Sequence, residues 1–249
     1  MSGRTWSQAA IGLRLFVATP RLHGLAAINF AVAAAGSMVL VNTVVYVQAE
    51  LGGSEQQTAL ALMFFGVGSL VAAMTVPRLL TRLTDRSVML VGVCIQVVTL
   101  FLGTLVPPFS GMLALWTLFG IGNSLILTPS GRILRRSSQQ TDRPALFAAQ
   151  FALSHFGWLI AYPLAGWLGA SYGLSVCFAV LGCVAGLALI AAWLVWPAVD
   201  EPVLDHVHED LPSSHPHLSD AVPAGSGFRH AHQFVIDDLH HRWPRSDRV

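Results

Sequence analysis

The sequence has few charged residues and no lysine. Asp, Glu, Lys and Arg make up only 11% of its 249 residues, whereas 54% are hydrophobic. An ordinary soluble domain carries about 25% charged residues, and a soluble fold of this size could not hide so much apolar surface. The composition therefore indicates an integral membrane protein. All 14 basic residues are arginine, and no mechanism follows from that fact alone.

Cysteine is scarce, and no catalytic constellation is present. Cys94, Cys177 and Cys183 lie in apolar runs without C-x-x-C spacing, which indicates packing residues. No serine, cysteine or carboxylate pair lies near a base at a useful spacing, and no glycine-rich loop follows a strand. We therefore expect no enzyme, no catalytic residues, no built-in cofactor and no nucleic-acid partner.

Long apolar segments dominate the first four-fifths of the chain. About 20 residues cross the hydrocarbon core as a helix, and backbone groups in lipid must be paired internally. The sequence therefore predicts an all-α bundle over 24–196, preceded by a cytoplasmic lead-in over 1–23 that lacks the features of a signal peptide. The six predicted spans are 24–47, 57–76, 88–106, 111–134, 145–170 and 174–196.

Arginine marks one side of the predicted bundle. The second connection, 77–86, reads P-R-L-L-T-R-L-T-D-R and holds three arginines, and four more surround the fourth connection. The remaining seven precede the first span or follow the last, so all 14 fall on one side. The positive-inside rule makes this side cytoplasmic. We expect a multi-pass protein of the plasma (bacterial inner) membrane with both termini in the cytoplasm.

Residues 197–249 have a different composition. They hold nine of the 13 acidic residues and eight of the ten histidines, with few apolar residues. Such a segment buries too little to order itself alone, so we predict a mostly disordered cytoplasmic tail. Residues 234–239, F-V-I-D-D-L, form the part that could dock or fold into a short element.

Three H-x-H pairs make the tail a candidate metal-binding segment. In an extended chain, residues two apart point the same way, so two imidazoles could chelate Ni²⁺, Co²⁺, Zn²⁺ or Cu²⁺. The alternative is a solvated tail with weak incidental affinity, because no spacing matches a closed structural site. The pairs are His206/His208, His215/His217 and His230/His232.

Five polar residues inside the predicted spans are candidates for a substrate or proton path. His155 is an ionisable group deep within a span, and such groups often face a pathway, although a neutral imidazole could also serve as packing. The amides are more often hydrogen bonds between helices than ligand contacts. They are Asn29, Asn42, Asn123 and Gln150.

Several sequence stretches resemble a known family. The run L-T-D-R over 83–86 resembles the core of the cytoplasmic loop motif G-x-x-x-D-R-x-x-R of the major facilitator superfamily, although Thr81 replaces the glycine and the later basic residue is missing. The run F-G-I-G-N-S-L-I-L-T-P-S-G-R over 119–132 is similar to the tenth helix of that family. Residues 163–173 are similar to the end of the eleventh. The resemblance covers about residues 20–197.

The resemblance implies a fold and a function. A full member has twelve spans in two halves, each built from two three-helix inverted repeats. This chain would be the C-terminal half, working with an N-terminal half or a second copy of itself. It would be a proton-coupled exporter, an antiporter, that moves small molecules by alternating access. Asp85 and Arg86 would latch the cytoplasmic helix ends.

Two alternatives stay open. Some family exporters that confer nickel or cobalt resistance end in histidine-rich tails, which makes divalent-metal efflux the first alternative. A truncated membrane protein that does not transport is the second.

Overall fold

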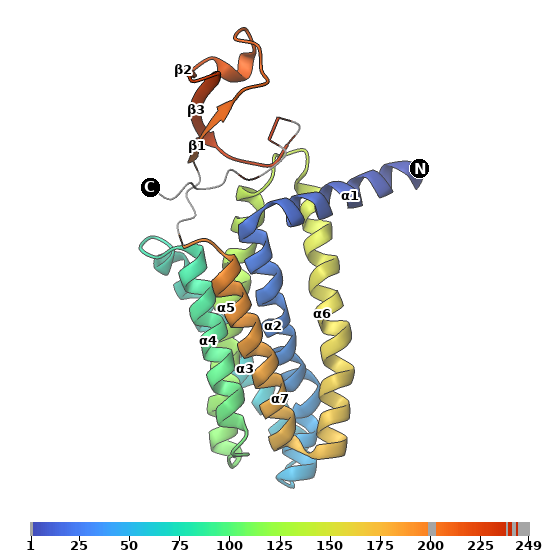
Figure 1. Cartoon of the computed structure of the whole chain (residues 1–249). Helices are drawn as coiled ribbons and strands as arrows, with labels where there is room; N and C mark the ends of the chain where they lie inside the picture. The colour runs from blue at the N-terminus through green and yellow to red at the C-terminus, as the bar shows by residue number, and fades with distance from the viewer. Residues whose placement is uncertain (1, 199–202, 238, 241–242, 244–249) are drawn as a thin grey trace.

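A bundle of parallel and antiparallel helices forms the body of the protein (Figure 1). The computed structural model describes residues 2–198, 203–237, 239, 240 and 243. Within these residues, six helices are long and apolar enough to cross a membrane. The prediction of an all-α membrane bundle with six spans is therefore confirmed.

The helices overlap the predicted spans and extend some of them by a turn. A short helix, α1 (Ser2–Ala18), precedes the bundle. The first span is α2 (Pro20–Val44), continued by the π-helical turn η1 (Val45–Glu50). The others are α3 (Glu55–Leu79), α4 (Asp85–Gly103), α5 (Phe109–Arg136), α6 (Arg143–Tyr172) and α7 (Leu174–Val195).

Local sequence signals set the helix ends. Ser54 and Gln57 form a capping box at the start of α3, each side chain accepting from the backbone N–H of the other. Thr84 caps α4 in a similar way, because its hydroxyl accepts from the backbone N–H of Ser87. Gly173 joins α6 to α7 with a φ of +81°, a conformation that favours glycine.

The packing repeats itself between the two halves of the bundle. Helix α3 packs mainly against α5, and its counterpart α6 packs mainly on α2 and α1. In the same way, α2 packs against α7 while α5 packs against α4. Exchanging α2, α3 and α4 for α5, α6 and α7 thus preserves the main contacts. This is the arrangement expected for two related three-helix repeats.

Helices α3 and α6 are the outer members of the bundle. They are the least buried of the six spans, and α2 is the most buried. Both present exposed apolar side chains along much of their length, including Leu70 on α3 and Leu159 on α6. The bundle therefore has a closed centre and two open flanks.

Helix α1 lies across one end of the bundle and does not run along the spans (Figure 1). It contacts α6, and Gly12 lies against the backbone carbonyl of Ala145. The basic connections between α3 and α4 and between α5 and α6 lie at the same end (Figure 1). One end of the molecule therefore gathers the arginine-rich segments.

The tail forms a small antiparallel sheet in the order β1-β3-β2. Its strands are β1 (Val203–His208), β2 (Val222–Ala224) and β3 (Gly227–Gln233), with the 3-10 turn η2 (Pro216–Leu218) between β1 and β2. The prediction of a disordered tail is therefore wrong for its described residues. That prediction was based only on the low apolar content of the tail and did not include backbone hydrogen bonds between its histidine-rich strands.

The end of the tail packs against the bundle. Phe234 and Ile236 are 2% and 1% exposed and join the main hydrophobic core. Asp237 then accepts hydrogen bonds from the bundle side, one from Arg14 of α1 to its backbone oxygen at 3.1 Å and one from Gln139 to its carboxylate at 2.8 Å. The sheet is thus tethered to the arginine-rich end of the bundle.

Candidate functional site

Asn29 and Gln150 form a reciprocal amide pair between α2 and α6. Each side chain donates to the oxygen of the other, at 3.3 Å from Asn29 and 3.2 Å from Gln150. Asn29 is only 6% exposed. The two amides satisfy each other, so this pair joins the outer helix α6 to the central helix α2.

Asn42 lies at a junction of three helices. Its amide donates to the backbone oxygen of Ala165 on α6 at 3.2 Å and to the sulfur of Cys177 on α7 at 3.5 Å. Its side chain is 1% exposed and its oxygen lies against Gly169. This geometry fits a packing role between helices.

Asn123 and His155 lie apart from these buried amides. Asn123 is half-buried on α5, next to Gly122, where α5 approaches Gly92 of α4. His155 is exposed on α6. Its Nδ1 lies 2.8 Å from the carbonyl of Phe151, and its ring stacks on the Phe151 ring with centroids 3.8 Å apart. The structure thus places the imidazole on an open flank of the bundle.

Asp85 joins the start of α4 to the end of α5. Its carboxylate is 1% exposed and accepts from Arg136 at 2.8 Å, with the Nε of Arg132 at 3.4 Å. The acid lies in the first turn of α4, and the arginines lie near the end of α5. Both placements are favourable to the dipoles of these helices.

Arg86 joins the same region to α7. Its Nε donates to the backbone oxygen of Trp196 at 3.0 Å, and its Nη2 donates to that of Trp193 at 2.9 Å. These carbonyls belong to the last turn of α7, whose backbone acceptors have no partner within the helix. Asp85 and Arg86 together connect three helix ends at the arginine-rich end of the bundle.

The arginine partners of Asp85 were not predicted from the sequence. Arg132 and Arg136 were used there only to predict which side of the membrane is cytoplasmic. Their spacing of four residues places both on one face at the end of α5. That spacing was the available signal, but the choice of Asp85 as their partner depends on the packing of α4 against α5.

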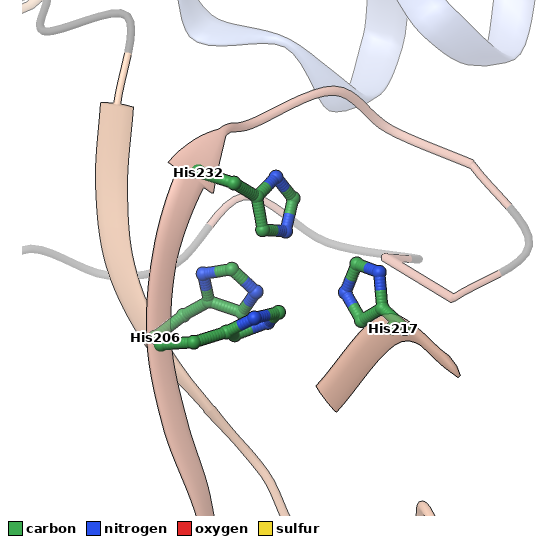
Figure 2. A group of neighbouring side chains, drawn as sticks. His206, His217 and His232 are labelled. Atoms are coloured by element: carbon green, nitrogen blue, oxygen red, sulfur yellow. The ribbon is translucent and has the colours of Figure 1, made fainter. Parts of the chain in front are cut away.

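The histidines of the tail gather on one face of the sheet. His206 of β1 pairs directly with His230 of β3. His208 and His232 lie two residues further along their strands and therefore share that face. Figure 2 shows the rings of His206 and His232 directed toward the same space as the ring of His217, which approaches from η2.

His217 and His240 complete the cluster from outside the sheet. The ring of His217 lies 4.9 Å from that of His232 and 4.6 Å from that of His230. The Nε2 of His240 lies 3.0 Å from the Nε2 of His206. His240 was not among the H-x-H candidates, because its proximity to the strands arises from the fold and not from the spacing of residues in the sequence.

His215 takes a different role from its partner in the H-x-H pair. Its Nδ1 accepts from the backbone N–H of His217 at 3.2 Å and so caps the 3-10 turn. The two pairs on strands keep the geometry that the sequence suggested. The side chains of His215 and His217 do not point in the same direction, because a 3-10 turn does not direct residues two apart to one side.

Burial keeps the clustered imidazoles neutral. It lowers the pKa of both His208 and His230 to about 4, and neighbouring imidazoles add to the effect. Burial also lowers the pKa of His206, His217 and His240. Neutral imidazoles have a free ring lone pair, which is the form that binds metal ions.

Comparison with known proteins identifies the family. The family profile described as Major Facilitator Superfamily matches residues 25–234, a range that begins inside the first span and includes the other five spans and the strands of the tail. No curated protein was found that matches the chain. The match covers most of the sequence and agrees with the six-helix bundle, so the chain belongs to the Major Facilitator Superfamily.

Proposed function

We propose that the chain is one half of a transport pathway, the C-terminal half of a two-part transporter. Membership of the family makes it a transporter, and the pseudo-symmetric bundle of six helices supports its assignment as one half. A pathway by alternating access needs a second bundle that moves relative to the first. The partner is an N-terminal half or a second copy of this chain.

The open flank of α6 is the observation that carries this proposal. It exposes His155, together with Phe151 and Leu159, at the depth of the membrane. An ionisable side chain facing lipid is costly, whereas one facing a partner bundle or a water-filled path is common at functional positions. We therefore place the second half against α6, with His155 at or near the path.

Proton-coupled export of a small molecule is the transport mode we propose. An imidazole can gain and lose a proton near neutral pH, which suits antiport. The latch around Asp85 and Arg86 would stabilise a state closed at the cytoplasmic end and open when the helix ends separate. Substrate binding would then favour one of the two states over the other.

The test measures proton flux in everted membrane vesicles with a pH-sensitive dye. Substrate probes are Ni²⁺, Co²⁺ and ethidium, added one at a time. At least one should dissipate the pH gradient, and His155→Gln should abolish that flux. His23→Gln removes another imidazole, one that contacts the carbonyl of Val17 outside the flank, and should leave the flux intact. Unchanged flux in His155→Gln would contradict the assigned role.

Divalent-metal efflux is the second candidate for the transported substrate. The observation that favours it is the cluster of imidazoles at the arginine-rich end of the bundle. A cluster there could collect the ion before transport. Flux with Ni²⁺ or Co²⁺ but not with ethidium would select this candidate. A chain that inserts but gives no flux with its partner present would support the non-transporting alternative.

We also propose that the arginine-rich end, the tail and both termini lie in the cytoplasm, in the plasma (bacterial inner) membrane. The basic connections support this orientation. In a cysteine-free background, Glu55→Cys should react with an impermeant thiol reagent added outside intact cells, and Arg82→Cys should not. Both positions are exposed. The reverse pattern would overturn the orientation.

A further inference from the structure

We propose that the histidine cluster of the tail is a folded binding site for one divalent transition-metal ion, with His206 and His217 as its shared ligands. The site is distinct from three separate H-x-H chelates, because it combines residues from two strands, a 3-10 turn and the docked segment. It does not depend on whether the bundle transports the ion.

Two bare lone pairs face each other within the cluster. Nδ1 of His206 lies 3.1 Å from the carbonyl of Leu204, and Nδ1 of His240 lies 2.8 Å from the carboxylate of Asp237. Both oxygens only accept hydrogen bonds, so each Nδ1 carries the hydrogen and each Nε2 is a lone pair. Those two Nε2 atoms are 3.0 Å apart. The two lone pairs repel each other at this distance, whereas a cation bound near both nitrogens would attract both lone pairs.

Further ring nitrogens in the cluster have no partner. The Nε2 atoms of His217, His230 and His232 are buried and make no hydrogen bond to the described residues. His232 is oriented like His206, because its Nδ1 lies 2.8 Å from the carbonyl of Gln233. Buried ring nitrogens without partners are costly in a protein that has no ligand for them. A metal ion would satisfy several of them at once.

The spacing of the nitrogens suits a single ion. Two sets of four imidazoles each have their ligand atoms within 4.8 Å of one another, and both sets include His206 and His217. Metal–nitrogen bonds of about 2.0–2.1 Å in tetrahedral geometry place ligand nitrogens about 3.3 Å apart. The Nε2 of His206 lies 3.1 Å from that of His208, near this value. Because the sets share two ligands, they accommodate one ion at a time.

The ligand chemistry defines the class of ion. All candidate donors are imidazole nitrogens, which suit Zn²⁺, Co²⁺, Ni²⁺ and Cu²⁺ and disfavour Mg²⁺ and Ca²⁺. The backbone and carboxylate acceptors on Nδ1 are the outer-shell partners that usually orient metal-binding histidines. A set of four imidazole ligands favours Zn²⁺ or Co²⁺ within that class, because four nitrogen ligands suit tetrahedral coordination.

The test titrates the full chain, purified in detergent and stripped with a chelator, with Zn²⁺ in a calorimeter. One Zn²⁺ per chain should bind. His206→Gln and His217→Gln should each weaken binding by at least about 100-fold, and Asp237→Asn, which weakens the contact that orients His240, by about 10–100-fold. His217 lies outside the strands, so its substitution tests the site without disturbing their pairing.

His215→Asn is the matched control. The asparagine oxygen can replace Nδ1 as the cap of η2 while an imidazole is removed. This variant should bind Zn²⁺ like the unmodified chain. Equal losses in His215→Asn and His206→Gln would show independent H-x-H chelates and overturn the folded site. Millimolar binding, or two or more ions of equal affinity, would overturn it as well.

Discussion

Asp85 is the buried acidic residue that joins the start of α4 to the end of α5. It accepts from Arg136 while its own side chain is almost completely buried, and Arg132 lies nearby. A buried acid held by two cations is a stronger contact than a pair on the surface. Its loss should therefore affect both the stability of the bundle and the cycle between its states.

Asp85→Asn should lower the free energy of unfolding by about 1.5–3 kcal/mol, because it removes charge-assisted hydrogen bonds to arginine. Thermal unfolding in detergent measures the change. Asp142→Asn is the control, since Asp142 precedes α6 without a side-chain capping bond and should be nearly neutral. Equal effects of the two substitutions would show that Asp85 has no special role.

His208 and His230 make the metal-free sheet sensitive to acid. Their pKa is about 4 in the folded tail, against 6.5 for an ordinary histidine. Below pH 6.5 the unfolded tail takes up protons that the folded tail does not, so folding loses stability as pH falls toward about 4. Above pH 6.5 these two groups contribute no pH dependence.

Hydrogen exchange over residues 203–233 of the chelator-treated chain, corrected for the intrinsic effect of pH, should show this loss. Protection should be constant from pH 8 to 7 and decline between 6.5 and 4. A double variant, His208→Gln with His230→Gln, should show a weaker decline. Protection that is higher at pH 5 than at pH 7 would contradict the assignment of buried neutral imidazoles.

At the scale of helices, glycine contacts hold the outer helix α3 on α5. A Cβ on Gly120 would meet the backbone oxygen of Phe65, and one on Gly68 would meet that of Thr117. Gly66, two residues before Gly68, has no heavy atom within 4 Å of such a Cβ. The close approach of α3 to α5 therefore involves the face of α3 that carries Gly68 and not Gly66, as expected for helix packing in membranes.

Gly120→Ala should destabilise the bundle by about 1–3 kcal/mol, because the helices must separate to accommodate the methyl group. Gly66→Ala should change stability by less than about 1 kcal/mol. Unfolding in detergent with increasing denaturant compares the two. A larger effect at Gly66 than at Gly120 would contradict the packing of α3 on α5.

The spans could be predicted because their signal is local. Apolar runs of sufficient length and arginines at one end are visible without any knowledge of contacts. Glycines at similar positions in the sequence differ in their packing, since a Cβ on Gly68 would meet α5 whereas one on Gly66 or Gly186 would meet nothing within 4 Å. Which glycine faces a neighbour depends on the rotation of each helix about its axis, and that is set by packing.

The tail was harder to predict because its interior is built of imidazoles. Strand prediction relies on alternating apolar and polar residues, and β1 and β3 alternate histidine with other residues instead. The H-x-H spacing correctly indicated a shared direction for two pairs. It could not reveal that the pairs meet across β1 and β3, or that His240 joins them, because those contacts span 24 to 34 residues.

For the whole molecule, the tail and the bundle meet at Asp237. One carboxylate oxygen contacts His240 of the cluster, the other accepts from Gln139, and the backbone oxygen accepts from Arg14. An ion bound by His240 would therefore stabilise the docked segment on α1 and on the connection between α5 and α6. The metal site and the position of the tail are linked through one residue.

Zn²⁺ should slow hydrogen exchange in residues 234–240 and in α1 of the full chain. Arg14→Gln, which alters the α1 side chain that donates to Asp237, should abolish the slowing in α1 while the sheet remains protected by Zn²⁺. Slowing confined to the sheet of the unmodified chain would show that the ion binds without affecting docking.

The central claim is that this bundle forms a transport path only with a second bundle against α6. Helix α7 also exposes large side chains, such as Leu187, but its polar residues are confined to Ser175 and cysteines, which suits lipid. Helix α6 instead exposes His155 one turn from Leu159.

Cysteine cross-linking in membranes of the source cells, with the native cysteines replaced, tests this claim most directly. Leu159→Cys and Leu187→Cys are equally suitable for labelling, since the two leucines are 69% and 68% exposed. Leu159→Cys should give a cross-linked product with a second six-span chain, and Leu187→Cys should give none. A chain that transports while neither position cross-links, or a product from Leu187→Cys alone, would contradict the account.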